Sequence, residues 1–235
     1  MAPPGLDAYK PRRNFEKTPA LMSTVALIDY GSGNLRSAEK ALQKAAAGLA
    51  RGPSVTTTDD QAVIAAADAV VLPGVGAFSA CMDQLEGRDG VIEAMVEAVR
   101  HRGRPFLGVC VGLQLLADRG LEFGVRAGLG WIGGEVRALE PADRRFKVPH
   151  MGWNSLQIEP GRALFAGQGA GDHMYFTHSF ALHCEDEGDV SAWTDHGGRF
   201  CAAVERGNVA GVQFHPEKSQ GAGQALLTRF LEWRP

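Results

Sequence analysis

The chain has few cysteines, no excess of basic residues and no long apolar segment, and each absence excludes a class of protein. Its four cysteines, Cys81, Cys110, Cys184 and Cys201, are too scattered for a disulfide scaffold, and no CxxC pair indicates a zinc site. A formal net charge of -3 provides no basic surface for nucleic acid. No apolar run approaches the roughly 18 residues of a membrane span. We therefore expect a cytoplasmic protein that binds no nucleic acid, membrane or metal.

What is present fits one α/β domain. The 235 residues, 45% of them hydrophobic, suffice for a full core. Residues 1–22 differ from the rest, being polar and rich in proline without an apolar signal region. We expect this segment to be a poorly ordered extension that precedes a domain over residues 23–235.

The first half of the chain alternates apolar strands with helices. Strands are predicted at residues 24–29, 54–57, 69–72 and 106–109. Helices are predicted at 35–47, with Ser32 or Asn34 as cap, from 59, near 80–85, at 91–100 and at 113–118. Continuous apolar strands between helices are typical of a mostly parallel sheet covered on both faces.

The second half changes character. Short strands joined by Gly-rich turns are predicted at residues 131–139, 154–159, 173–180, 190–194, 200–205 and 209–214. A closing helix is predicted at 221–233. The expected fold is therefore a three-layer α/β domain, with a central, mostly parallel sheet, helices on both faces and an antiparallel extension.

One cysteine stands in a distinctive turn. The stretch Gly108-Val109-Cys110-Val111-Gly112-Leu113-Gln114 follows a buried strand and precedes a helix-like segment. A small-x-Cys-x-Gly turn of this kind is the cysteine version of the nucleophile elbow. Its glycines permit a sharp bend, and a helix N-terminus favours the thiolate. We predict that Cys110 attacks a carbonyl carbon.

A base and its orienting group follow the last predicted strand, in His215-Pro216-Glu217. In extended chain, residues i and i+2 point to the same side, so Glu217 can accept a hydrogen bond from His215. The other imidazole nitrogen then faces Cys110, which completes a triad.

A site for the oxyanion follows another strand, in Pro73-Gly74-Val75-Gly76. Its glycines permit backbone that aims N–H groups into a pocket. We predict the N–H groups of Val75 and of Val111, the residue after the nucleophile, as the two donors. Each motif alone is mostly incidental, but three of them in this order, each at a strand end, indicate an active site.

The other cysteines and histidines have no comparable surroundings. We interpret Cys81 and Cys201 as small apolar residues and Cys184 as a surface or turn residue. The remaining histidines show no metal-ligand spacing. His150 and His178 stand out because both lie inside distinctive local motifs.

The elbow and His-Pro-Glu resemble the class I (triad) glutamine amidotransferases. Further blocks are similar to the family of glutaminase subunits of imidazole glycerol phosphate synthase: residues 28–37 (IDYGSGNLRS), 72–78 (LPGVGAF), 149–154 (PHMGWN), 175–180 (YFTHSF) and 213–220 (QFHPEKSQ). The resemblance covers residues 24–233. It implies that Cys110, His215 and Glu217 hydrolyse glutamine to glutamate and ammonia, without a cofactor.

The resemblance also implies binding residues. Gln114, His178, Ser179 and Phe180 match glutamine-pocket positions, to which we add Gly76. Relatives often carry Tyr where this chain has Phe180, so only its backbone can make a polar contact.

The resemblance further implies a partner. Ammonia would pass to a cyclase subunit, a (β/α)₈ barrel, which makes imidazole glycerol phosphate and AICAR in histidine biosynthesis. Asn34, Trp153 and Lys218 match positions near the interface of such a heterodimer and its ammonia gate. Each also has a structural interpretation, as a helix cap, a core residue and a solvated charge. Rotation of the Gly74–Val75 peptide could switch the oxyanion site when the liganded cyclase binds.

Three alternatives stay open at this point. The chain could be the glutaminase subunit of another amidotransferase pathway, against which residues 28–37 and 149–154 argue. It could be a non-catalytic scaffold, against which the intact triad argues. It could be a cysteine peptidase or related thiol protein on a similar sheet, which would not be expected to combine His-Pro-Glu with Gln114.

Overall fold

The computed structural model describes residues 22–143, 145–169 and 172–235. The extension expected over residues 1–22 therefore lies outside the described residues, except for Met22, whose side chain is buried in the core. No helix in the described ranges is long and apolar enough to cross a membrane.

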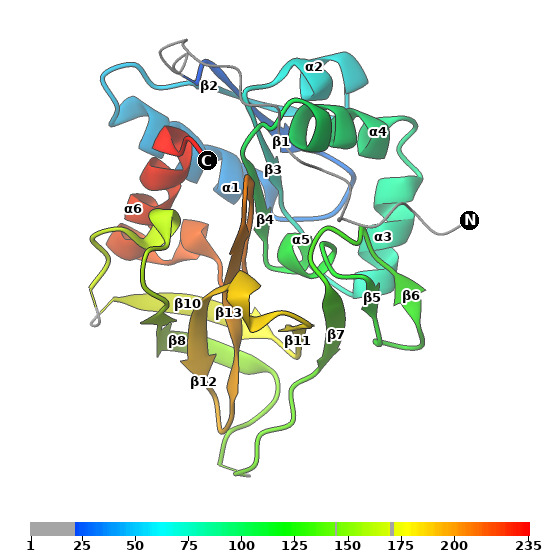
Figure 1. The fold of residues 1–235 in the computed structure, drawn as a ribbon, viewed down its shortest axis with the longest axis vertical. Helices are drawn as coiled ribbons and strands as arrows, with labels where there is room; N and C mark the ends of the chain where they lie inside the picture. The colour runs from blue at the N-terminus through cyan, green and yellow to red at the C-terminus, as the bar shows by residue number, and fades with distance from the viewer. Residues whose placement is uncertain (1–21, 144, 170–171) are drawn as a thin grey trace.

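An eight-stranded sheet forms the centre of the domain (Figure 1). Its strands, in spatial order, are β2 (Ser54–Thr58), β1 (Thr24–Ile28), β3 (Ala69–Leu72), β4 (Phe106–Val109), β14 (Val209–Val212), β13 (Arg199–Arg206), β12 (Val190–Asp195) and β9 (Gln157–Ile158). The five strands from β2 to β14 are parallel, and the remaining three pair antiparallel.

Helices cover both faces of this sheet, as expected. In Figure 1, α1 (Leu35–Ala47) and α6 (Gln220–Glu232) lie on one side of the strands. On the other side lie α2 (Gln61–Ala66), α3 (Phe78–Glu86) and α4 (Val91–Val96), which continues as a π-helical segment, Glu97–His101. This arrangement confirms the three-layer α/β class.

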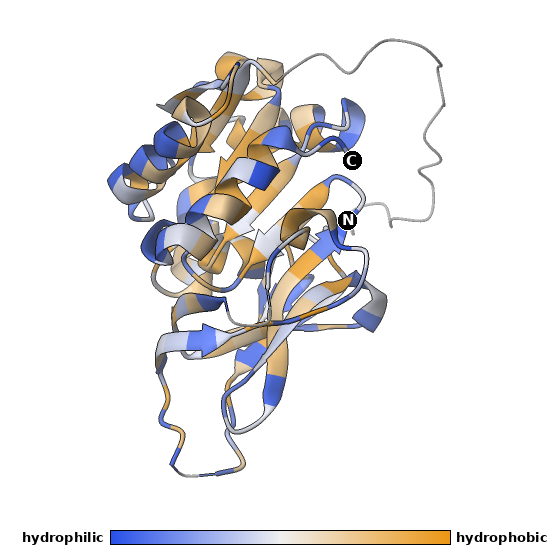
Figure 2. Cartoon of the chain, turned by 90° about the vertical axis from the view of Figure 1, so that its left-hand side faces the viewer, coloured by the Kyte–Doolittle hydropathy of each residue, from blue (hydrophilic) through white to orange (hydrophobic). Residues whose placement is uncertain are grey.

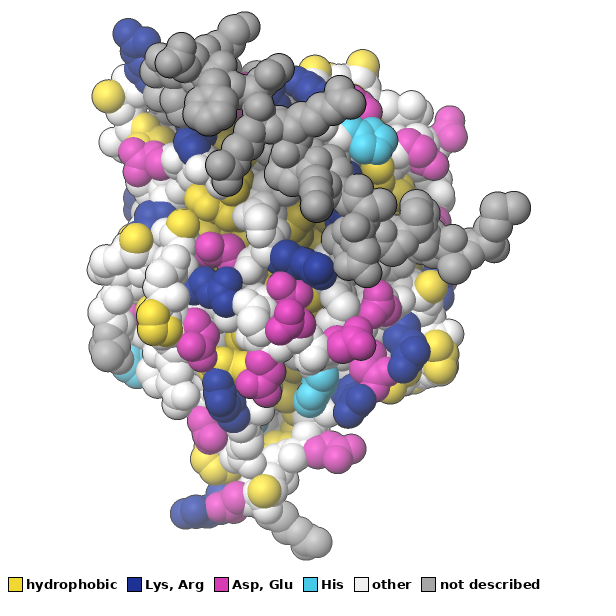
Figure 3. All heavy atoms as spheres, viewed as in Figure 1, with side chains coloured by type: hydrophobic (Ala, Val, Ile, Leu, Met, Phe, Trp, Pro, Cys, Tyr) yellow, Lys and Arg dark blue, Asp and Glu magenta, His cyan; other side chains and the backbone are white. Residues whose placement is uncertain are grey.

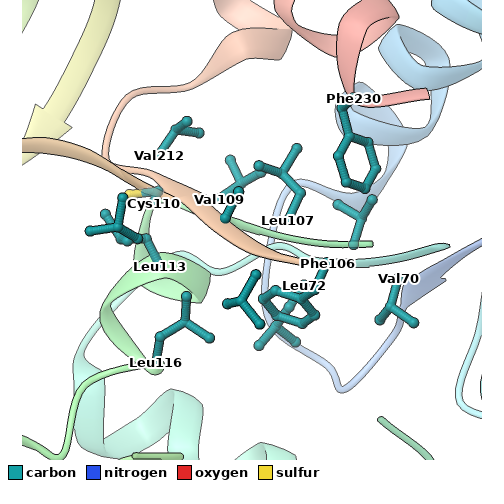
Figure 4. Close-up of a cluster of buried hydrophobic side chains, with 14 of the residues drawn as sticks. Val70, Leu72, Phe106, Leu107, Val109, Cys110, Leu113, Leu116, Val212 and Phe230 are labelled. Carbon is teal, nitrogen blue, oxygen red and sulfur yellow. The ribbon is translucent and has the colours of Figure 1, made fainter. Parts of the chain in front are cut away.

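The central strands are apolar because both of their faces are covered. Every residue of β3, β4 and β14 is buried, and Figure 2 shows these strands as hydrophobic while the outer helix faces are hydrophilic. Figure 4 shows both faces packed, with Leu107 and Phe230 on one side of the strands and Phe106 and Val70 on the other. A parallel sheet with this composition places the ends of its strands, rather than their faces, at the surface.

Strands β13, β12 and β9 are the expected antiparallel extension of the central sheet. Two smaller sheets accompany it. One pairs β8 (His150–Ser155) with β10 (His173–His178). The other joins, in order, β11 (Phe180–Cys184), β7 (Gly134–Ala138), β5 (Arg119–Gly120) and β6 (Arg126–Ala127). Both are antiparallel except for the pair of β5 with β7. In the space-filling view of Figure 3, the face seen in Figure 1 intersperses acidic and basic side chains.

Several predicted strand boundaries are wrong. The strand expected at 154–159 is two strands, β8 and β9, in different sheets, and the one expected at 173–180 ends at His178. Ser179 is the break that lets β10 and β11 join different sheets. The two-residue strands β5 and β6 carry too few residues to show a period of two.

Two helix predictions also need correction. The helix after Cys110, α5, spans only Val111–Gln114, because the carbonyls of Leu115, Leu116 and Ala117 accept hydrogen bonds from residues 129–132 instead of from a continuing helix. Neither candidate cap of α1 acts as one: Asn34 makes no side-chain cap hydrogen bond, and the Ser32 hydroxyl donates to the carbonyl of Val75.

Candidate active site

The three candidate motifs follow three neighbouring strands. Cys110 follows β4, and β4 lies between β3, which precedes Pro73–Gly76, and β14, which precedes His215. Because these strands are parallel, their carboxyl ends lie at the same edge of the sheet. Cys110, His215, Val75 and Gly76 all line one cavity of about 310 Å³.

Cys110 has the strained backbone of a nucleophile elbow. Its φ is 55° and its ψ is −110°, a conformation that non-glycine residues rarely adopt. Its N–H donates to the carbonyl of Val212 at 2.8 Å, which ties the elbow to β14. Figure 4 shows the sulfur just beyond the buried side chains of Val109 and Val212.

The two glycines of the elbow allow close packing rather than the bend itself. A Cβ on Gly112 would lie 1.9 Å from the carbonyl oxygen of Leu72, and a Cβ on Gly108 would lie 2.5 Å from that of Gly112. The left-handed conformation belongs to Cys110, not to its neighbouring glycines. The short α5 also corrects a second expectation, because a single turn supplies little of the helix dipole expected to stabilise a thiolate.

His215 and Glu217 form a buried pair. Nδ1 of His215 lies 2.8 Å from Oε1 of Glu217, and the side chains are only 3% and 5% exposed. The pairing agrees with the prediction, but its backbone does not, because Pro216–Lys218 is a 3₁₀ turn rather than extended chain. Ser219 was not foreseen: its buried hydroxyl donates to the carbonyl of His215 and accepts the N–H of Tyr175.

His215 is poised to exchange a proton. Its Nε2 is buried and has no hydrogen-bond partner among the described residues. Burial by itself lowers the pKa of His215, but Cys110 and Glu217 outweigh burial and raise that pKa to about 9. Because this pKa lies above neutral pH, His215 carries a proton beside Cys110.

Both predicted oxyanion donors are engaged elsewhere. The N–H of Val111 donates to the carbonyl of Gly74 at 3.4 Å. The N–H of Val75 is directed toward the hydroxyl of Ser32 at 3.5 Å. In this arrangement neither of these two N–H groups is free to receive a negatively charged oxygen.

The segment around Gly74 is held at both ends. The Tyr30 hydroxyl donates to the carbonyl of Pro73 at 2.8 Å, and Ser32 and Cys81 donate to the carbonyl of Val75 at 2.8 and 3.3 Å. Cys81 is buried as expected, but it is not merely an apolar residue. Sequence reasoning missed this role because no local pattern links Cys81 to a loop six residues earlier.

The predicted glutamine-pocket residues lie together. Gly76, Gln114, His178, Ser179 and Phe180 all line the cavity that contains Cys110. The structure adds lining residues that we did not predict: Glu122, Pro149 and Thr177.

Gln213 is another polar residue that the sequence analysis missed. It is fully buried, accepts a hydrogen bond from Gln114 at 3.0 Å and lies 3.7 Å from the sulfur of Cys110. It directly follows β14, two residues before His215, and a single polar residue at such a position carries no pattern of its own.

The three candidate interface residues are exposed. Trp153 is 47% exposed, which excludes the interpretation as a core residue. The ring of Trp153 contacts the ring of Tyr175, and the ammonium of Lys218 lies 5.9 Å from the centroid of the Tyr175 ring. Lys218 also borders the Cys110 cavity, whereas Asn34 is exposed at the start of α1.

The remaining cysteines form a close pair. Cys201 is buried as expected, but Cys184 ends β11 rather than lying in a turn, and the two sulfurs are 4.0 Å apart. Among the described residues, no group of three or more His, Cys, Asp or Glu could hold a metal ion.

Comparisons with known proteins agree with this site. Residues 26–233 match the family described as Glutamine amidotransferase class-I. The imidazole glycerol phosphate synthase subunit HisH of Caulobacter vibrioides is 59% identical over 214 residues, which cover 91% of this chain and 100% of that protein. The HisH subunit of Rhodospirillum rubrum is 52% identical over 212 residues, 90% of this chain and 99% of that protein.

A solved structure supports the fold. A crystal structure of a glutamine amidotransferase superposes with a TM-score of 0.66, covering 88% of this chain and 97% of that one, at 20% identity. At such identity the match concerns the fold alone. It is the same fold that we derived from the alternation of strands and helices.

Proposed function

The chain belongs to the class-I glutamine amidotransferases and, within them, to the family of HisH subunits of imidazole glycerol phosphate synthase, and from this premise we propose how its own residues carry out the reaction. The substrate is glutamine, the products are glutamate and ammonia, and the ammonia is consumed by a cyclase subunit in histidine biosynthesis. The observation that carries this proposal is the convergence of Cys110, His215 and Glu217 at one cavity.

The first half of the reaction forms a thioester. The Cys110 thiolate attacks the side-chain amide carbon of glutamine, and the electron pair of the carbonyl moves onto its oxygen. When the carbonyl re-forms, the C–N bond breaks and His215 gives its proton to the leaving ammonia. Glu217 holds the imidazole through Nδ1, so that Nε2 faces the reacting atoms.

The second half regenerates the enzyme. His215 takes a proton from water, whose oxygen attacks the thioester carbon, and the C–S bond then breaks. Glutamate leaves and Cys110 recovers its thiolate. The raised pKa of His215 fits this cycle, because the imidazolium must persist beside the thiolate at neutral pH.

The cavity around Cys110 fits an amino acid. Glu122 supplies a carboxylate for the α-ammonium group, and its Oε2 is held by the N–H of Phe78 at 2.8 Å. Both donating hydrogens of Gln114 are used, toward the carbonyl of Phe180 and toward Gln213. Gln114 therefore offers its Oε1 to the cavity as an acceptor.

The partner is a cyclase subunit of the (β/α)₈ type, forming a heterodimer in the cytoplasm. Lys218 lines the cavity, and its ammonium and the ring of Trp153 both lie against Tyr175. The nearby side chains of Met151 and Val148 are 65% and 42% exposed. Exposed apolar side chains gathered next to a site are typical of a protein interface. We place the ammonia exit near Trp153 and Lys218, with Asn34 at the rim of the contact.

Glutamine hydrolysis by the purified chain tests this proposal, measured as glutamate release alone and with a cyclase subunit and its ribotide substrate. We expect release to rise strongly in the complex, because both oxyanion donors are engaged in the chain alone. Cys110→Ala should abolish release while the complex still forms. Glutamate release by Cys110→Ala at the wild-type rate would contradict the mechanism.

A further inference from the structure

His150 takes no part in the proposed chemistry, yet hydrogen bonds connect it to the glutamine pocket. Its Nδ1 lies 3.0 Å from Nε2 of His178, and both side chains are buried. Nδ1 of His178 in turn lies 2.9 Å from the carbonyl oxygen of Phe180, at the cavity wall.

The hydrogen-bond partners determine which ring nitrogen of His150 and of His178 carries the proton. A carbonyl oxygen only accepts, so Nδ1 of His178 carries the hydrogen and its Nε2 is the acceptor. Nδ1 of His150 must then donate, which leaves Nε2 of His150 to accept from the amide of Asn154 at 3.4 Å. The same amide nitrogen donates to the carbonyl of Asp195 at 2.7 Å.

At its other end this series of hydrogen bonds reaches Cys110. The carbonyl of Phe180 accepts a second hydrogen bond, from Nε2 of Gln114 at 2.9 Å. Gln114 also donates to Gln213, whose own amide nitrogen lies 3.7 Å from the sulfur of Cys110. The Phe180 carbonyl is therefore the point where the histidine chain and the cysteine side of the site join.

Packing holds the ring of His150 in this orientation. The ring is stacked between Phe176, at 4.8 Å between ring centroids, and His196, at 4.1 Å. Burial lowers the pKa of His150 to about 3 and that of His178 to about 4. Both rings are therefore neutral at pH 7, as the single direction of the hydrogen bonds requires.

We propose that His150 is a positioning residue for the glutamine pocket, which fixes His178 in one tautomer so that the Phe180 carbonyl can orient Gln114. This inference rests on the proposed glutaminase function. It assigns to His150 an effect on the binding of glutamine rather than on the attack by Cys110, since the hydrogen bonds reach the pocket wall before they reach the sulfur.

The placement of β8 gives this role a second consequence. His150 is buried and Asn154 partly buried, whereas the alternate residues Met151 and Trp153 are exposed. Strand β8 thus carries the histidine chain on one face and the proposed partner surface on the other. A partner that shifts β8 would reach the glutamine pocket through His150.

Two amide variants separate this role from packing. His150→Asn places an amide N–H near the position of Nδ1 and keeps a donor for His178, whereas His150→Gln places its amide near Nε2 and loses that donor. Both variants remove the ring and its stacking. Their difference therefore reports the hydrogen bond to His178.

The readout is covalent inactivation of Cys110 by a diazoketone analogue of glutamine, measured in the complex with the cyclase subunit. We expect the half-saturating concentration for His150→Gln to rise about tenfold, because His178 loses a buried partner. His150→Asn should stay within about threefold of wild type, and the maximal inactivation rate should change little in either variant. Alkylation of Cys110 by iodoacetamide should likewise be unchanged.

The outcomes distinguish the two proposals. Failure of the analogue to label wild-type Cys110 would contradict the glutaminase function, whereas equal saturation of the two variants would overturn the role of His150. A measurement without variants covers the case in which they fail to fold. Nitrogen NMR of the ¹⁵N-histidine wild type at pH 7 should show His150 and His178 both protonated on Nδ1, and a proton on Nε2 of either ring would overturn the proposal.

Discussion

The carbonyl of Gly74 accepts the N–H of Val111 at 3.4 Å, so a proposed oxyanion donor is occupied by the chain itself. This bond and the 3.5 Å contact of the Val75 N–H with Ser32 are both long, which makes them weak. The flanking carbonyls of Pro73 and Val75 are held at 2.8 Å. The Gly74–Val75 peptide is thus held weakly between two carbonyls with short hydrogen bonds, as its proposed rotation requires.

Removing the Ser32 hydroxyl should favour the rotated peptide. In Ser32→Ala, the Val75 N–H loses its acceptor, whereas the Val75 carbonyl keeps Cys81 as a donor. We expect basal glutamate release by the isolated chain to rise about fivefold, corresponding to about 1 kcal/mol. Ser79→Ala on the neighbouring α3 is the matched control, and a fall in basal release for Ser32→Ala alone would contradict the switch.

Glu217→Gln tests the orienting carboxylate. The variant removes the charge that helps to raise the pKa of His215, and an amide can present its NH₂ group to the imidazole. We expect kcat/KM for glutamine to fall about 10³-fold and alkylation of Cys110 at neutral pH to slow. Glu232→Gln, at the exposed end of α6, should change neither rate.

Parts of this site could be predicted from the sequence because each is local. The elbow, the His-Pro-Glu pair and the Pro-Gly-Val-Gly turn are short segments, and the parallel strands that precede them determine where they meet. The pairing of His215 with Glu217 was predicted although its backbone argument was wrong, because residues two apart can also meet across a 3₁₀ turn. The order of the strands itself required the structure.

The missed features depend on contacts between distant residues. Helix α5 ends early because residues 129–132 take its carbonyls, and no propensity of residues 115–118 reveals that competition. Tyr30 and the buried Gln213 likewise contact partners far away in the sequence. Single residues of this kind carry no periodic pattern.

Gly112→Ala tests the close approach of the elbow to β3. Its Cβ would lie 1.9 Å from the carbonyl oxygen of Leu72, a backbone atom that cannot move away alone. We expect the free energy of unfolding in urea to fall by about 3 kcal/mol. Gly221→Ala in α6 is the control, because its Cβ meets nothing within 4 Å, and it should raise stability by up to about 1 kcal/mol. Equal stability of the two variants would contradict the packing argument.

The buried histidines should make stability sensitive to acid. The pKa of His178 is lowered to about 4, so the native ring stays neutral where the unfolded ring, near 6.5, takes up a proton. Its contribution is present above pH 6.5 and is lost as the pH falls from 6.5 toward 4. In urea unfolding between pH 7 and 5, His178→Asn should lose less stability than wild type. If the free energy of unfolding falls equally in the two proteins between pH 7 and 5, His178 is not held neutral in the folded state.

Trp153→Ala tests the partner surface. Trp153 is 47% exposed in the chain alone, so its loss should change the stability of the chain by less than about 1 kcal/mol. A large aromatic residue at the centre of an interface typically contributes 2 kcal/mol or more, which corresponds to a loss of affinity of about 30-fold. Titration of the cyclase subunit by calorimetry measures this loss. Val125→Ala, at a position 76% exposed between β5 and β6, provides the comparison, and equal affinities of the two variants would place the interface away from β8.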